Sequence, residues 1–389
     1  MFVDLTPDQF ALRQTVRDYF NDLMTPELRV RLRGAEAGDE YRQVIRKMGA
    51  DGWLAVGWPK EHGGQGYAAT EQLIFFEEAN IAGAPLPFVT ISTVGPALMA
   101  HGSAAQKARF LPGIAAGEIL FSIGYSEPDA GSDLATLKTR ATLENDRFVV
   151  NGNKLWTSGA EAADYIWLAA RTDPERARHK GVSILIVDTS LAGFSHTVIN
   201  TVSNPTAATY YDNVEVAADM LVGELHGGWK LMTAQLNHER LGLGSWSDKA
   251  AGTFSRVLRW ARARDEQGRR AVDEPWVRRA FAECYARLEA MRLINLRIAA
   301  ELEAGRMDVG LASATKVYGS ESAIDVLRRL SEIVGASALV RAGSAAALLL
   351  GELEYEVRAA TTLTFGGGTN ELQRELIAQF GLSMPRTVR

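Results

Sequence analysis

The hydrophobic periodicity of the chain changes twice along its length. Up to residue 116, apolar residues recur at helical spacing, whereas residues 117–225 form short segments rich in β-branched and aromatic residues. Residues 226–389 return to long helical patterns. A run of strands between two runs of helices predicts an α+β fold with an N-terminal α-helical domain, a middle antiparallel β domain and a C-terminal α-helical domain, divided at these positions.

The start of the first helix is marked by Thr6-Pro7-Asp8-Gln9. Thr6 can cap the helix, Pro7 suits the first turn and Gln9 completes a capping box. Further helices are expected at about residues 40–48, 70–82, 94–101, 104–115, 229–264, 275–304, 310–333, 344–363 and 371–380. Strands are expected in the segments EILFSIGY, ATLKTRATL, RFVVNGNKLW, YIWLAAR, GVSILIVDT and ATYYDNVEV.

Composition excludes several classes of function. The formal net charge of -5 gives no general attraction for phosphate backbones, so we expect no nucleic-acid partner. The lone Cys284 cannot form an internal disulfide, and the six histidines form no cluster with ligand spacing, so no metal site is expected. The sequence has neither a signal peptide at its start nor an apolar run long enough for a membrane span, which indicates a cytoplasmic protein.

Three motifs carry candidate chemistry. YSEPDAGSD follows a predicted strand, and its Pro128 and Gly131 indicate a sharp turn that exposes N–H groups and small hydroxyls. KLWTSG ends a later strand, and its Trp156 can stack on a planar cofactor. FGGGTNE follows the last long helix. Taken singly, the first motif is equally compatible with a plain turn, and a tryptophan at a strand end is more often a core residue than a cover for a cofactor.

Together, these motifs resemble those of the FAD-dependent acyl-CoA dehydrogenase family, and GWPKEHGGQG resembles its early glycine-rich loop. The resemblance extends over nearly the whole chain and implies a C-terminal four-helix-bundle domain. It also implies FAD as the cofactor and an acyl-CoA as the substrate. The family binds FAD in an extended groove, which agrees with the absence of a Rossmann G-x-G-x-x-G fingerprint.

The family motifs assign residues to the flavin ring. By this resemblance, Ser126 hydrogen-bonds the N5 edge of the flavin, and Tyr125 offers backbone contacts. Trp156 packs on the ring and Ser158 hydrogen-bonds it.

The resemblance also assigns residues to the rest of the cofactor and to the substrate. Ser132 would lie near the cofactor and the phosphopantetheine of the substrate. Thr369 and Glu371 would approach the pyrophosphate and ribityl region of FAD.

The reaction requires a carboxylate base that removes the proton α to the thioester carbonyl while hydride leaves Cβ for the flavin. Family members place the base in one of two positions. One directly precedes the Gly-Thr of the C-terminal motif, and here it is Gly367. The other is a Glu-Arg pair on a long helix, which Glu239 and Arg240 match. We therefore expect Glu239 to be the base.

The neighbours of Glu239 suit this role. Leu236, Glu239, Arg240 and Leu243 share one helical face, so the carboxylate would be desolvated and its pKa raised. Substrate contacts are expected from Ser132 and from the residues around the base, namely Leu236, Arg240, Leu243 and Gly367.

Two departures from the family concern assembly. The segment ARARDEQGRRAVDEP lacks the Phe-Gly that reaches a neighbour's FAD in homotetramers, and Glu332 replaces a glutamine with the same purpose. The chain either holds FAD differently as a homo-oligomer or pairs with a paralogous subunit that donates the missing residues. It resembles the base-bearing subunit of actinobacterial steroid side-chain acyl-CoA dehydrogenases, which favours a heterotetramer over a homotetramer.

The expected activity is oxidation of an acyl-CoA to the 2,3-enoyl-CoA, with an electron-transfer flavoprotein as acceptor and possible use of a steroid side chain. Two alternatives stay open. One is an acyl-carrier-protein dehydrogenase or flavin oxidase of the same fold. The other is a non-catalytic subunit of a heteromeric dehydrogenase.

Overall fold

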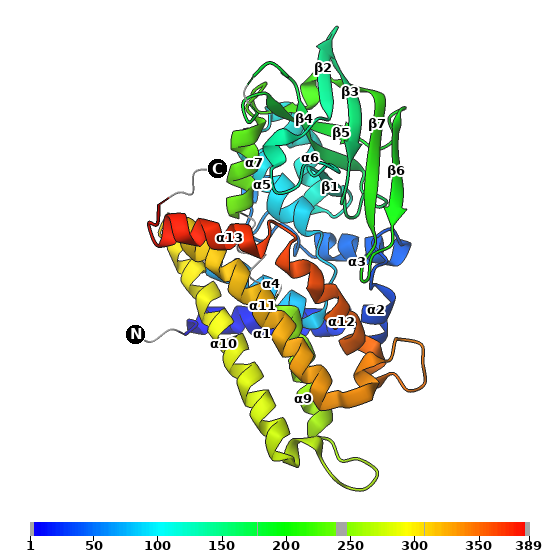
Figure 1. Cartoon of the computed structure of the whole chain (residues 1–389), viewed down its shortest axis with the longest axis vertical. Helices are drawn as coiled ribbons and strands as arrows, with labels where there is room; N and C mark the ends of the chain where they lie inside the picture. The colour runs from blue at the N-terminus through cyan, green and yellow to red at the C-terminus, as the bar shows by residue number, and fades with distance from the viewer. Residues whose placement is uncertain (1–3, 177, 239–246, 307, 386–389) are drawn as a thin grey trace. The chain divides into compact units, whose positions relative to one another are not determined.

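The computed structural model describes residues 4–176, 178–238, 247–306 and 308–385 (Figure 1). It divides into two compact units, each assembled from segments that are distant in sequence. The helical unit contains Met1–Arg31, Tyr67–Ala84 and Arg240–Arg389, and the sheet unit contains Leu32–Gly66 and Pro85–Glu239. The proposed boundaries at residues 116 and 225 stay a prediction.

The helical unit begins with the predicted capping box. The Thr6 N–H donates to Gln9 Oε1 at 3.0 Å, and the Gln9 N–H donates to Thr6 Oγ1 at 3.3 Å. The α-helices of this unit are α1 (Pro7–Leu23), α2 (Pro26–Arg31), α4 (Ala69–Ala82), α9 (Ser247–Arg262), α10 (Pro275–Glu303), α11 (Val309–Val334), α12 (Glu352–Ala360) and α13 (Asn370–Leu376).

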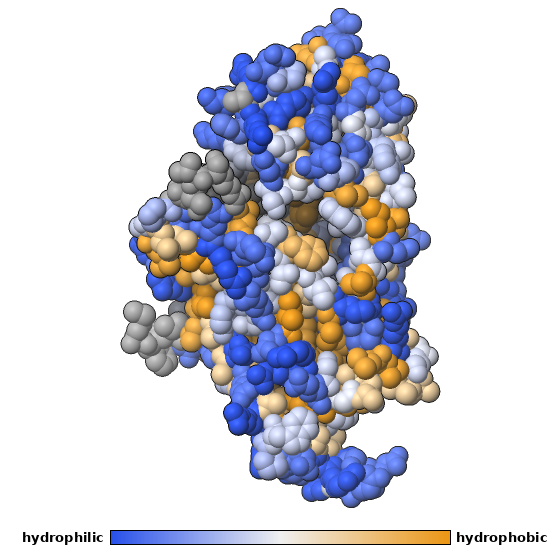
Figure 2. Space-filling view, viewed as in Figure 1, coloured by the Kyte–Doolittle hydropathy of each residue, from blue (hydrophilic) through white to orange (hydrophobic). Residues whose placement is uncertain are grey.

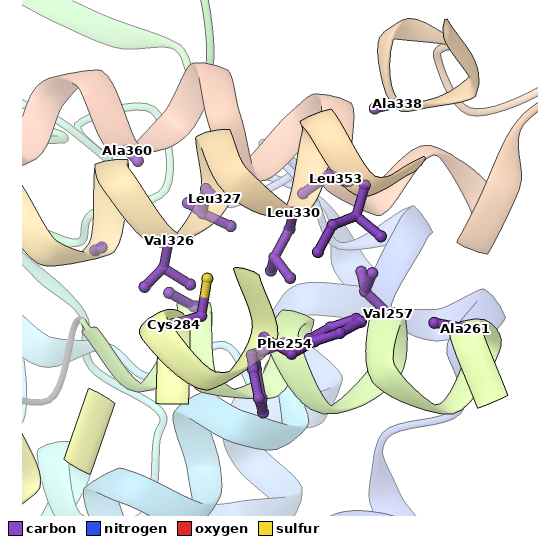
Figure 3. Packing of buried hydrophobic residues seen from close by; sticks show 14 of the residues in the cluster. Phe254, Val257, Ala261, Cys284, Val326, Leu327, Leu330, Ala338, Leu353 and Ala360 are labelled. Atoms are coloured by element: carbon purple, nitrogen blue, oxygen red, sulfur yellow. The ribbon is translucent and has the colours of Figure 1, made fainter. Parts of the chain in front are cut away.

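Four of these helices, α9, α10, α11 and α12, share one hydrophobic core, which confirms the expected bundle (Figure 3). Phe254 and Val257 come from α9, and Leu330 and Leu353 come from α11 and α12. Cys284 of α10 is fully buried in this core, and burial raises the pKa of its thiol to about 11, so it behaves as a small apolar residue.

The predicted helix at residues 344–363 is wrong in its first part. Leu349 and Leu350 have φ values of 49° and 56°, which no α-helix accommodates, and α12 begins only at Glu352. The expected helix at 229–264 is described as α7 (Gly228–His238) and α9, and the segment between them lies outside the described residues.

Among its described residues, the sheet unit carries eight strands beside short helices (Figure 1). The strands are β1 (Phe121–Gly124), β2 (Arg140–Glu144), β3 (Arg147–Lys154), β4 (Tyr165–Arg171), β5 (Val182–Asp188), β6 (Phe194–Ile199), β7 (Thr206–Ala217) and β8 (Leu221–Val222). The α-helices are α3 (Asp39–Ala50), α5 (Gly95–His101), α6 (Ala104–Ala115) and α7.

The sheet order is β6-β7-β3-β2-β4-β5-β8, with β1 also paired to β4. Most pairs are antiparallel, as predicted, but β1 and the start of β2 run parallel to β4. Parallel pairing is possible here because long segments separate these strands in the chain, whereas a tight hairpin enforces the antiparallel arrangement. The sheet is therefore mixed.

The parallel pairings place the end of β1 beside β2. Because β5 occupies one edge of β4 along its whole length, β1 and β2 must share the other edge. β1 pairs with β4 up to Gly124↔Leu168, and β2 takes over at Arg140↔Arg171. The segment of residues 125–139 leaves the sheet at this exchange of partners. No helix in the described part of the chain is long and apolar enough to cross a membrane.

Candidate functional site

The structure brings the first two motifs into direct contact. YSEPDAGSD starts where β1 ends, and KLWTSG starts at the last residue of β3. The backbone N–H of Leu155 donates to the carbonyl of Ser126 at 2.9 Å, which joins the two segments side by side. The Tyr125 hydroxyl accepts a hydrogen bond from Trp167 Nε1 at 3.1 Å, so its side chain is tied into the sheet.

A buried ion pair lies behind this contact. The side chain of Lys154 is fully buried, and its Nζ donates to Glu127 Oε1 at 2.8 Å and to the Tyr125 carbonyl at 3.0 Å. Glu127 also accepts the backbone N–H groups of Lys138 at 2.6 Å and Thr139 at 2.8 Å. Both oxygens of the carboxylate are thereby satisfied.

Burial and pairing together shift the pKa values of both groups. Burial lowers the pKa of Lys154 to about 8, and the Glu127 carboxylate partly offsets this effect. Burial works against the charge of Glu127, but the Lys154 ammonium and its hydrogen bond, with those of Thr139 and Lys138, outweigh it. The pKa of Glu127 therefore lies below its ordinary value, and the pair is charged at neutral pH.

Trp156, two residues after the buried Lys154, is exposed. Its side chain is 57% exposed although it is large and apolar, and its φ of 65° is in the left-handed region that side chains rarely adopt. Hydrogen bonds on both sides hold this backbone. Leu155 N–H is bonded to Ser126, and the N–H of buried Thr157 donates to the Ala207 carbonyl at 2.9 Å.

The Ser158 and Ser126 hydroxyls, one from each of these two motifs, differ in their hydrogen bonding. Ser158 Oγ lies 2.9 Å from Thr206 Oγ1, and the Ser158 carbonyl accepts from Ser122 Oγ at 3.0 Å. The Ser126 hydroxyl has no hydrogen-bonding partner among the residues that the structure describes. An exposed planar indole beside an unused hydroxyl and a fixed backbone fits the stacking and edge hydrogen bonding of a planar heteroaromatic ring.

The far end of the first motif is a solvent-exposed turn. The Glu127 N–H donates to the Ala130 carbonyl at 2.9 Å, which closes the turn, and Ser132 is exposed beyond it. Arg178 Nη1 contacts Asp133 Oδ2 at 3.0 Å across the surface. The Ser132 hydroxyl is thus accessible to a ligand.

The third motif lies in the helical unit and caps α13. Gly367 and Gly368 have φ values of 69° and 94°, and a Cβ at Gly368 would come within 2.8 Å of Gln373 Nε2. Thr369 Oγ1 accepts the Leu372 N–H at 3.2 Å, which leaves its own proton free to donate. Glu371 is exposed on the first turn of α13.

A buried asparagine anchors the third motif to α11. Lys316 Nζ donates to Asn370 Oδ1 at 2.7 Å, and Asn370 Nδ2 donates to Ser320 Oγ at 3.0 Å. Burial lowers the pKa of Lys316 to about 8, an effect that Glu371 and Glu321 partly offset.

The residues expected to perform proton abstraction cannot be placed. Glu239, Arg240 and Leu243 lie outside the described residues, as do Gly242 and Gly244. Leu236 belongs to α7, which ends at His238 in the described part of the chain. The backbone of Gly367 bears on the alternative position for the base, because a carboxylate residue there would have to adopt its positive φ.

Sequence reasoning missed Glu127 and Lys154. Both lie inside the quoted motifs, beside the hydroxyls and the tryptophan that would touch a cofactor. The available signal was a lysine at the end of one predicted strand and a glutamate just after another. Charged residues at such positions are buried only when paired.

Comparison with protein families identifies the fold and the motifs together. The models of the N-terminal, middle and C-terminal domains of acyl-CoA dehydrogenases match residues 6–118, 122–214 and 226–382. The chain belongs to the acyl-CoA dehydrogenase family, whose members are oxidoreductases that in general depend on a flavin.

Individual relatives are similar over their full length. The chain is 48% identical over 402 residues to acyl-CoA dehydrogenase FadE26 of Mycobacterium tuberculosis, covering 100% of both proteins. The solved Tcur3481-Tcur3483 steroid acyl-CoA dehydrogenase has a chain with a TM-score of 0.95 and 47% identity, again covering 100% of both chains. A chain of the ChsE4-ChsE5 complex from M. tuberculosis gives a TM-score of 0.92 and 48% identity at the same coverage.

Proposed function

We propose that this chain is an FAD-dependent acyl-CoA dehydrogenase that introduces a trans-2,3 double bond into the CoA thioester of a steroid side chain. The observation that carries the proposal is the contact between YSEPDAGSD and KLWTSG, which sets the exposed Trp156 beside Ser126. The steroid substrate is supported by the similarity to the Tcur3481-Tcur3483 steroid enzyme.

FAD fits the residues that are present. Trp156 would stack on the flavin ring, and the unused Ser126 hydroxyl, the Tyr125–Ser126 backbone and Ser158 would hydrogen-bond its edge. The free proton of Thr369 suits a phosphate oxygen of the pyrophosphate. Glu371 can only accept hydrogen bonds, which suits the ribityl hydroxyls. When bound, FAD supplies the acceptor for the hydride from Cβ.

The protein must supply the base. Glu239 would remove the α-proton, and the leucines at 236 and 243 would keep water away from its carboxylate and so raise its basicity. Arg240, on the same face, would help to orient the substrate. The lack of a side chain at Gly367 supports this assignment, because the alternative base position holds no carboxylate.

The proposed reaction is tested by incubating the flavin-loaded protein with acyl thioesters in the absence of oxygen. A panel of linear, branched and steroid side-chain acyl-CoAs, together with the matching carrier-protein thioesters, is compared by bleaching of the flavin absorbance and by mass spectrometry of the product. The expected result is fastest bleaching with a steroid side-chain thioester and a product two hydrogens lighter. Bleaching only with carrier-protein thioesters, or none with any member of the panel, would contradict the proposal.

The same preparation distinguishes the dehydrogenase from a flavin oxidase. Electron-transfer flavoprotein is the proposed acceptor, so it should reoxidise the reduced flavin much faster than air does while product is bound. Rapid reoxidation by oxygen would favour the oxidase.

A paralogous subunit is the proposed partner. The ChsE4-ChsE5 relative is a complex of two proteins. The exposed Glu332 at the end of α11 supports the same assembly here, since a carboxylate is unfavourable near a pyrophosphate. Figure 2 shows apolar side chains in orange among polar ones over the helical unit. Phe380 and Leu382 are 60% and 67% exposed, as expected of an unoccupied interface.

Expression alone and together with a candidate paralogue tests the assembly. We expect the chain alone to hold little FAD and the co-purified pair to hold FAD and to react. A fully FAD-loaded, active homo-oligomer would contradict the heteromer.

A further inference from the structure

The Lys154–Glu127 pair is set directly behind the backbone that would face the flavin. Lys154 and Leu155 are consecutive residues, and they donate to the carbonyls of two other consecutive residues, Tyr125 and Ser126, at 3.0 Å and 2.9 Å. The Lys154 bond holds the peptide unit between Tyr125 and Ser126, and the Leu155 bond holds the next unit, between Ser126 and Glu127.

Glu127 fixes the cation in turn. Its carboxylate accepts from Lys154 and from the backbone of Lys138 and Thr139, at the point where the chain returns to form β2. These contacts hold the Lys154 ammonium group between the Tyr125 carbonyl and the Glu127 carboxylate. Both ends of the segment of residues 125–139, which leaves the sheet between β1 and β2, are thus hydrogen-bonded to this ion pair.

Burying a cation to hold a single carbonyl has a large desolvation cost. Removing an ammonium and a carboxylate from water costs several kcal/mol for each ion, and well-packed apolar residues of similar size often replace such pairs without loss of stability. The position of the charge suggests an electrostatic effect as well. A donor on a carbonyl polarises the peptide unit, so the N–H at the other side of the same unit, that of Ser126, becomes a better donor.

We propose that Lys154, held in place by Glu127, is a positioning residue for the flavin. It orients and polarises the Tyr125–Ser126 peptide so that this peptide donates a hydrogen bond to the ring and stabilises the negative charge of the reduced flavin. The inference rests on the proposed FAD-dependent function. It implies that the pair contributes both to retention of FAD and to its reduction potential.

Three variants of the holoenzyme test the role, prepared in the oligomer in which the wild type holds FAD. Lys154→Met removes the cation, Glu127→Gln removes the anion, and the double variant removes both charges and avoids an unpaired buried ion. The readouts are the dissociation constant of FAD and the midpoint potential of the bound flavin, measured with redox dyes. Arg147→Met is the control, because Arg147 at the start of β3 forms an exposed pair with Glu215 of β7.

Both single variants should make the flavin potential more negative. Lys154→Met removes the positive charge near the reduced anionic flavin. Glu127→Gln removes the carboxylate that keeps the buried Lys154 protonated, so Lys154 loses its charge at neutral pH. The double variant should remain folded and bind FAD about tenfold more weakly, equivalent to about 1.4 kcal/mol. Arg147→Met should leave both readouts unchanged.

The alternative outcomes separate the two levels of the proposal. If both single variants leave the potential unchanged or shift it to more positive values, the electrostatic role is wrong. A double variant with wild-type affinity for FAD would overturn the positioning role. A wild-type protein that holds no flavin in any assembly would instead overturn the proposed function.

Discussion

Trp156 combines exposure with a strained backbone, which is unusual for a tryptophan. Side chains rarely adopt a φ of 65°, and the cost of doing so is of order 1–3 kcal/mol. Burial of a core tryptophan would offset this strain, but the Trp156 side chain is 57% exposed. Burial within the sheet unit therefore does not offset the strain, whereas stacking on a ligand would.

Replacement of Trp156 separates a cofactor role from a core role. Trp156→Ala should change the urea midpoint of the cofactor-free protein little, because little apolar area is buried there, and should weaken FAD binding markedly. Leu143→Ala on β2 is the control, since Leu143 is 51% exposed in the same unit. A large loss of stability in the cofactor-free Trp156→Ala protein would indicate a core residue.

Arg256 and Glu352 form a buried ion pair that joins α9 to α12. Arg256 Nε donates to Glu352 Oε1 at 2.6 Å, and Thr253 Oγ1 donates to the same oxygen at 2.9 Å. Arg256→Met should cost about 3–5 kcal/mol in the free energy of unfolding, because it removes one partner of a buried ion pair. Arg279→Met, which breaks an exposed pair on α10, should have little effect.

Denaturant unfolding of both variants checks the prediction. Equal stability of Arg256→Met and the wild type would show that Glu352 is compensated by other groups.

At the level of elements, periodicity located the helices well, since each buries one face. The helix predicted at 104–115 is observed as α6 (Ala104–Ala115), and the YIWLAAR segment forms β4. β6 (Phe194–Ile199) was missed because none of its residues is fully buried, so no apolar alternation marks it. The break at Leu349–Leu350 was missed because leucine normally favours a helix.

The candidate site was only partly predictable for a similar reason. Motifs located the residues that would touch the cofactor, because those motifs are continuous in sequence. The Lys154–Glu127 pair joins residues that are 27 positions apart, and their contact depends on the exchange of strands along one edge of β4. Pairings of this kind follow from the three-dimensional arrangement of the sheet.

The packing of α1, α4 and α9 buries a cluster of charged groups that should titrate. Glu77 on α4 is almost fully buried beside Arg13, and its Oε1 has no partner within the described structure. Burial raises the pKa of Glu77 to about 7, against the effect of Arg13, and Glu78 contributes to the increase. Burial likewise raises the pKa of Asp248 on α9, and Glu77 contributes.

At Glu77, the folded protein therefore binds more protons than the unfolded chain between about pH 4.5 and pH 7. Stability should fall as the pH rises through this window, by at most about 1.4 kcal/mol per pH unit for one proton. Glu77→Gln should flatten the dependence, measured as the urea midpoint at pH 5 and at pH 7.5. Glu27→Gln on α2 is the exposed control, and the same slope in Glu77→Gln and the wild type would contradict this assignment.

At the level of the whole molecule, the exposed apolar residues after α13 bear on assembly. Phe380, Leu382 and Met384 are each more than half exposed and lie close together in sequence. Phe380→Ser combined with Leu382→Ser should leave folding nearly unchanged, because neither side chain is buried in the chain alone. It should disrupt the complex with the paralogous subunit.

Light scattering of the co-purified protein measures this effect as a loss of mass. An oligomer of unchanged mass would place the interface elsewhere. The exposed Leu143→Ser on β2 provides the matched change away from the segment.

The central claim is that Glu239 removes the α-proton. The most direct measurement is the rate of flavin reduction by an acyl-CoA in the absence of oxygen, followed by rapid mixing for the wild type, Glu239→Gln and the exposed control Glu175→Gln. Glu239→Gln should retain FAD and slow flavin reduction by about 10²–10⁴-fold, whereas Glu175→Gln should match the wild type. Flavin reduction at the wild-type rate in Glu239→Gln would contradict the claim.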